Sequence, residues 1–169
     1  MDLSTLANVA TALTVITGVF FALLEARRAR QDRDERAAFA TVRALFTPAW
    51  ITSANYVQQM PEGTTVEQIE NDIRLYKAVH SVLVILEGLG YSVFARVIPL
   101  HVVDDLMGGM VRVTWRNLHE YVEYERGMSR SQKNWEWVEW LADQIERNGS
   151  GRTNLQIGAQ IAYRDWKPE

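Results

Sequence analysis

The chain has 169 residues, enough for one domain and a short additional element. It contains no cysteine, which excludes disulfide bonds and thiolate metal sites, and its formal net charge of −3 argues against nucleic-acid binding as the main activity. Hydrophobic residues make up 47% and charged residues 23% of the chain, as in an ordinary globular protein, so the order of the residues is more informative than their totals.

The segment Leu3–Leu24 has no charged side chain, and the arginine-rich sequence Arg27–Arg30 follows it. A helix of this length covers about 33 Å, against about 30 Å of bilayer hydrocarbon. A cleaved signal peptide would carry a basic residue before the run, and a core helix of a soluble protein or oligomer is the other alternative. We predict a single transmembrane anchor over residues 1–24. The one-sided arginines predict an outside N-terminus and a cytoplasmic C-terminal body.

Small side chains recur every four residues along this predicted anchor, at Ala10, Thr14, Gly18 and Ala22. Such a row lets two helices approach closely in lipid, where packing drives association. Chance is the alternative, since these residue types are common in such helices. The row predicts a homo-oligomer.

Residues 25–46 contain no helix breaker and many charges, which predicts a helical stalk outside the membrane. Thr47 and Pro48 then favour the start of a second helix that ends near Gln59. The pair Thr64 and Glu67 has the spacing of a capping box and predicts a third helix. Apolar residues continue from it at steps of three and four, and Gly88 and Gly90 are expected to end it.

A fourth helix is expected from Pro99 to Gly108-Gly109, and a fifth over Met110–Arg126. The last helix is expected to be capped by Ser129 or Ser131 and to run to about Arg147. Its inward residues are expected to be Val138, Leu141, Ala142 and Ile145. The sequence therefore predicts an all-α protein, with a bundle of about five helices over residues 47–147.

The tail, residues 148–169, has a different pattern. Leu155, Ile157, Ala159, Ile161 and Tyr163 alternate with other residues, which is typical of a β-strand. A lone strand has no partner here. We predict an irregular tail that is flexible or ordered by a partner.

No pattern in the chain predicts catalytic, cofactor-binding or metal-binding residues. His119, Glu120 and Glu123 have a spacing that can hold a metal ion, but two ligands on one helix face do not form a site. Serine nucleophile motifs are absent from the sequence, and without cysteine there is no Cys–His pair. The lack of a catalytic motif favours a protein that is not an enzyme and leaves the enzyme alternative open.

Glu87 is the most unusual single charge, because it follows the apolar run Val82–Leu86 and precedes Gly88. Burial of a carboxylate predicts a nearby cation or a raised pKa. The candidate partners are Arg96 and then Arg116. A structural ion pair is favoured over a catalytic acid, because no second group completes an active site.

Trp135, Trp137 and Trp140 lie within about a turn and a half of the last predicted helix. They cannot all face one core, so at least one is expected to be exposed. This tryptophan is the predicted contact for a protein partner.

Leu86–Gly90, the apolar stretch to Gly108, Trp115 and Trp137–Ala142 together resemble a bacterial family described as a domain of unknown function. Its members are short proteins with one N-terminal transmembrane helix and an all-helical cytoplasmic body. The resemblance implies this fold and topology, and it implies no activity.

These observations favour a membrane-tethered helical interaction or scaffold module that self-associates and binds a protein partner. A small-molecule sensor or enzyme with a pocket near Glu87 is the second hypothesis. An accessory subunit of a larger membrane complex is the third. An apolar pocket with polar groups around Glu87 would favour the second, and an exposed tryptophan surface would favour the first.

Overall fold

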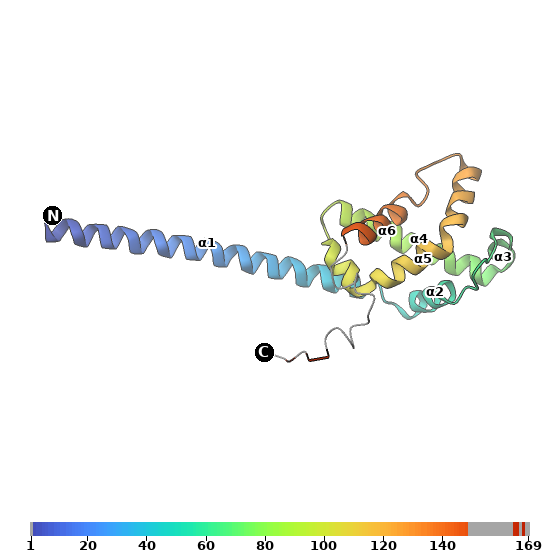
Figure 1. The fold of residues 1–169 in the computed structure, drawn as a ribbon, viewed down its shortest axis with the longest axis horizontal. Coiled ribbons are helices and arrows are strands. Elements are labelled where there is room, and N and C mark those ends of the chain that lie inside the picture. Colours follow the sequence, from blue (N-terminus) through green and yellow to red (C-terminus); the bar gives the residue numbers. More distant parts are fainter. Residues whose placement is uncertain (1, 149–163, 166, 168–169) are drawn as a thin grey trace. The chain divides into compact units, whose positions relative to one another are not determined.

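The computed structural model describes residues 2–148, 164–165 and 167, and for residues 3–12, 31 and 148 it describes the backbone alone. Every regular element in these residues is an α-helix (Figure 1). The helices are α1 (Leu3–Ala44), α2 (Pro48–Gln58), α3 (Val66–Asn71), α4 (Ile73–Phe94), α5 (Leu100–Ser129) and α6 (Glu136–Asn148). The all-α prediction is therefore confirmed for the described residues. The tail with the alternating pattern, residues 153–164, lies almost wholly outside them.

The chain divides into two compact units, Met1–Ala37 and Ala38–Glu169. The first unit consists of the N-terminal part of α1. The second unit, which we call the helical body, has its own hydrophobic core, to which Ala38 and Val42 contribute.

Large apolar side chains are exposed along the N-terminal unit. Between 55% and 65% of the surface of each is accessible: Leu13, Val15, Ile16, Val19, Phe20, Phe21 and Leu23. At about 100° per residue these positions occupy three sides of the helix. Thr14, Gly18 and Ala22 take the fourth side and are also exposed, while the side chain of Ala10 lies outside the described part.

α4 is the central helix of the body, and it packs against α2, α3, α5 and α6. Its inner face is buried through Ala78, Val79, Val82, Leu83, Leu86, Leu89, Gly90 and Val93. Among the described residues α4 is also the one helix that is long and apolar enough to cross a membrane. A helix at the core of a globular body can be equally long and apolar, and α4 is such a core helix.

Two local signals set the first helix starts of the body. The side chain of Thr47 accepts a hydrogen bond from the N–H of Trp50, and Pro48 occupies the first turn of α2, as expected. The capping box that starts α3 is one residue later than predicted, because Thr65 and Gln68 exchange the reciprocal hydrogen bonds instead of Thr64 and Glu67.

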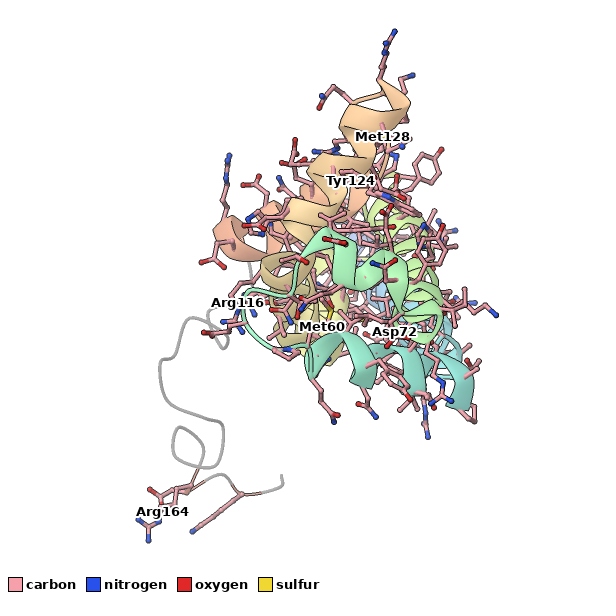
Figure 2. All side chains as sticks on the ribbon, turned by 90° about the vertical axis from the view of Figure 1, so that its right-hand side faces the viewer. Met60, Asp72, Arg116, Tyr124, Met128 and Arg164 are labelled. Carbon is pink, nitrogen blue, oxygen red and sulfur yellow. The ribbon has the colours of Figure 1, made fainter. Side chains whose placement is uncertain are left out.

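The predicted third helix is in fact two helices that meet at Asp72 (Figure 2). One carboxylate oxygen of Asp72 accepts hydrogen bonds from the N–H groups of Arg74 and Leu75. Asp72 therefore caps a new helix within a continuous apolar pattern.

The prediction that Gly88 and Gly90 end this helix is wrong, because α4 continues to Phe94. Gly90 lies where the backbone of α6 approaches α4: a Cβ there would overlap the carbonyl oxygen of Trp137 and lie 2.8 Å from its carbonyl carbon. The glycine permits helix packing at this position and does not terminate the helix.

The predicted fourth and fifth helices form the single helix α5, which passes through Gly108-Gly109. A Cβ on Gly108 would overlap a carboxylate oxygen of the buried Asp104, so this glycine also leaves room for a neighbour.

α6 begins at Glu136, five residues after the later of the two predicted serine caps. The hydroxyl of Ser129 donates to the carbonyl oxygen of Glu125, and the hydroxyl of Ser131 accepts from the N–H of Lys133, so neither caps this helix. The four predicted inward residues of α6 are all buried, which confirms the face of the helix that packs on the body: Val138, Leu141, Ala142 and Ile145.

Candidate functional site

The N-terminal end of α6 is held by a carboxylate from α4. One carboxylate oxygen of Glu87 accepts hydrogen bonds from the N–H groups of Trp137 (3.1 Å) and Val138 (3.0 Å). These N–H groups belong to the first turn of α6, where a helix has no internal acceptors for them and attracts negative charge. Glu87 therefore caps a helix that lies 50 residues further along the chain.

Burial raises the pKa of Glu87, and the two backbone N–H groups oppose this rise only in part. The predicted raised pKa is thus confirmed, although Glu87 is half-buried and does not lie within the hydrophobic core. The predicted partners are wrong: Glu87 binds backbone N–H groups, and the described structure records no ion pair between Glu87 and Arg96 or Arg116.

A buried arginine from α5 holds the turn before α6. Arg126 is 5% exposed, and its guanidinium donates to the carbonyl oxygens of Asn134 (2.9 Å) and Trp135 (3.4 Å). It also forms ion pairs with Glu123 at 2.8 Å and Glu139 at 2.7 Å. Although burial acts in the opposite direction, these two carboxylates raise the pKa of Arg126. α6 is therefore fixed by a negative group from α4 and a positive group from α5.

The carboxylate of Glu125 accepts hydrogen bonds from two side chains beside this turn and lies next to a histidine ring. The hydroxyl of Tyr121 donates to it at 3.1 Å and the indole N–H of Trp135 at 2.7 Å, while Nε2 of His80 lies 3.4 Å away. Burial and the adjacent carboxylate raise the pKa of Tyr121. Because its oxygens are occupied by these groups, we interpret Glu125 as a structural acceptor.

The three tryptophans do not form one exposed surface. Each is half-buried, and Trp135 is directed to Glu125 and packs edge-on against His80. Trp137 and Trp140 instead belong to an aromatic cluster with Tyr91 and Phe94. Its ring centroids are 4.6 Å apart for Phe94 and Trp137, and 5.9 Å apart for Trp137 and Trp140. The prediction that at least one of them is exposed is wrong, because the side chains of all three are half-buried.

A groove of about 660 Å³ lies between α5 and α6. Trp115 and Trp140 supply its apolar surface, and charged side chains of both signs supply the rest. Its lining residues are Arg112, Trp115, Arg116, Glu136, Glu139, Trp140, Ala142, Asp143, Glu146 and Arg147.

Ion pairs within and beside the groove balance most of its charges. Arg112 binds the buried Asp104 at 3.2 Å and Glu146 at 3.4 Å, and Arg147 binds Asp143 at 2.7 Å. Arg116 also lines the groove, and its side chain is exposed (Figure 2). The groove thus combines two indole rings with fixed charges, a composition suited to binding another protein.

Sequence reasoning missed this groove. A signal was present, because Glu136, Glu139, Asp143 and Glu146 recur at helical spacing and predict an acidic face on α6. The opposite wall, which includes Arg112 and Trp115, could not be predicted because these residues lie far from α6 in the sequence.

His119, Glu120 and Glu123 do not converge. Nδ1 of His119 lies 3.0 Å from the carbonyl oxygen of Arg116, and Glu123 is bound to Arg126. Among the residues that the structure describes, no three histidine, aspartate or glutamate side chains gather as metal ligands do.

Comparison with protein families gives one match. The model of the family described as "Domain of unknown function (DUF4760)" matches residues 12–145. Neither the search of curated proteins nor the search of solved structures gave a match.

Proposed function

We propose that this chain, which belongs to the DUF4760 family of domains of unknown function, is a membrane-tethered helical interaction module that self-associates through its N-terminal helix. The observation that carries the proposal is the exposure of large apolar side chains on three sides of α1 between Leu13 and Leu23. In water this surface would be unfavourable, whereas lipid solvates it.

The chemistry of α1 supports a membrane anchor. The uncharged run Leu3–Leu24 matches the thickness of bilayer hydrocarbon, and a helix satisfies its own backbone hydrogen bonds in lipid. Arginines follow the run directly, which favours a cytoplasmic helical body.

The fourth side of α1 supports self-association. Thr14, Gly18 and Ala22 are exposed between the larger apolar residues, and a Cβ on Gly18 would meet nothing within 4 Å. Two copies could therefore bring their backbones close along this side, with Ala10 extending the row.

Replacement of Gly18 by isoleucine tests the self-association. We expect association of the full chain in native membranes to weaken roughly tenfold, which corresponds to about 1.4 kcal/mol, because the β-branched side chain separates the helices. Energy transfer between two labelled copies measures it, and extraction at alkaline pH checks that the chain stays in the membrane. Val19→Ile, on a neighbouring side, is the matched control. Equal association of both variants and the parent would contradict the proposal, and release from the membrane would contradict the anchor.

The groove between α5 and α6 is the proposed site for a protein partner. It offers indole surface from Trp115 and Trp140 beside charges of both signs, so we expect a partner segment with an apolar anchor and charged neighbours. Of the three tryptophans first considered, Trp140 is the one that lines this groove.

A photo-crosslinking residue at position 143 of the full chain tests the partner site in native membranes. We expect a discrete crosslinked protein whose yield falls several-fold with Arg116→Glu, because the reversed charge lies in the lining of the groove. Lys133→Glu makes the same charge change at an exposed residue outside the groove and is the control. Identical crosslinked proteins from position 143 and from the exposed position 132 would argue against the site.

The second hypothesis, a sensor or enzyme using Glu87, has less support. The carboxylate already accepts two backbone hydrogen bonds, and Glu87 does not line the groove. A role as accessory subunit of a membrane complex is compatible with the groove, since its partner would then be another subunit.

A further inference from the structure

The outward side of α4 is apolar along the length of the helix. Ile73, Val84 and Tyr91 recur at helical spacing on one face and are 61%, 57% and 55% exposed. Gly88 and Ala95 are exposed on the same face. We call this set the outer face of α4, and it comprises Ile73, Lys77, Val84, Gly88, Tyr91 and Ala95.

The outer face carries one charged residue, and it is a cation. Lys77 lies within it, and the exposed Arg74 and Arg96 lie near its two ends. The neighbouring carboxylates are engaged elsewhere, because Asp72 caps α4 and Glu87 caps α6. The acidic residues Glu136, Glu139, Asp143 and Glu146 of α6 line the groove between α5 and α6. The surface is therefore apolar with a basic fringe.

Aromatic side chains continue the surface at its C-terminal end. Tyr91 packs edge-on against Trp137 at 5.6 Å between ring centroids, and the half-exposed Phe94 packs against the same indole at 4.6 Å. Tyrosine and tryptophan favour the boundary between water and lipid, since each has an apolar ring and a polar group.

We infer that the outer face of α4, with Phe94 and Trp137, rests on the surface of a bilayer that contains anionic lipids. The inference rests on the proposed anchor, which holds the body near the membrane and so raises its effective concentration there. Exposed apolar residues with a fringe of lysine and arginine are typical of helices that lie in the interface. The opposite side of α4 packs in the core of the body, so only its outer face can contact lipid. We therefore infer that the helix axis lies parallel to the bilayer surface.

The absence of cysteine from the chain allows a direct test with single labels. Val84→Cys, labelled with an environment-sensitive dye, is reconstituted as full chain into phosphatidylcholine vesicles with one quarter phosphatidylglycerol and with brominated acyl chains. We expect strong quenching by the brominated lipid. Met128→Cys is the matched control, because Met128 is an exposed apolar residue on α5 and is expected to show no quenching.

The charge fringe gives a second measurement. Lys77→Glu is expected to reduce quenching at position 84, and so is omission of phosphatidylglycerol, whereas Lys133→Glu leaves it unchanged. A dye at position 84 that is unquenched and accessible to aqueous iodide would overturn the inference. A disulfide between two copies of the unlabelled Val84→Cys variant would also overturn the inference, because a second copy of the chain would then cover the outer face of α4. A dye at Phe20→Cys reports insertion of α1, so loss of the anchor is distinguished from loss of the surface contact.

Discussion

Replacing Gly90 by alanine is expected to destabilise the helical body by about 3 kcal/mol, the upper range for an overpacked core. The added Cβ would overlap the carbonyl oxygen of Trp137 and lie 2.8 Å from its carbonyl carbon. These are backbone atoms, so they cannot move aside without shifting α6 from α4. Denaturant unfolding of the full chain in detergent, followed by tryptophan fluorescence, measures the effect.

Gly88 provides a control within the same helix. A Cβ there would meet nothing within 4 Å, and Gly88 is exposed. Gly88→Ala is therefore expected to stabilise α4 by roughly 0.5–1 kcal/mol, because alanine loses less backbone entropy than glycine. A similar change in unfolding free energy for both variants would show that helices α4 and α6 do not approach closely at Gly90.

Replacing Arg126 by methionine is expected to cost about 3–5 kcal/mol of unfolding free energy, as when one partner of a buried ion pair is removed. Methionine fills much of the volume but leaves Glu139 and the carbonyl oxygens of Asn134 and Trp135 without their donor. The same unfolding measurement in detergent gives the value.

Arg147→Met is the matched control for this variant. Arg147 also pairs with a carboxylate, Asp143 at 2.7 Å, but its side chain is 71% exposed. Exposed pairs contribute about 0–1 kcal/mol. Equal losses from the two variants would contradict a buried structural role for Arg126.

The helix starts that depend on neighbouring residues could be predicted from the sequence. Thr47 and Pro48 begin α2 because a side-chain acceptor and a fixed φ act within one turn. The inward face of α6 was also correct, since the spacing of Val138, Leu141 and Ile145 reflects burial directly.

The predicted glycine stops failed for a different reason. The conformational cost of glycine is about 1 kcal/mol in a helix, and packing can exceed it. At Gly90, the backbone of Trp137 occupies the space that a side chain would fill. At Gly108, the buried carboxylate of Asp104 occupies that space. Trp137 lies on another helix, so its approach to Gly90 depends on the tertiary fold. Asp104 lies one turn before Gly108 on the same helix.

Glu87 shows how far sequence reasoning could reach for the candidate site. Its position after an apolar run predicted burial and a raised pKa; the pKa is raised, and the side chain is half-buried. Its hydrogen-bond donors could not be predicted, because they are backbone N–H groups, which almost every residue has, and no residue type identifies them in the sequence. The groove was missed similarly, since its two walls come from helices whose pairing is a property of the whole body.

The capped start of α6 has a consequence for the order of events during synthesis. The N-terminal part of the chain leaves the ribosome first, so α4 is complete while α6 is still unmade. Until Trp137 and Val138 emerge, Glu87 lacks its hydrogen-bond donors and the backbone at Gly90 lacks its neighbour. We therefore expect the packing of the nascent body to remain incomplete until α6 has been made and has docked on α4.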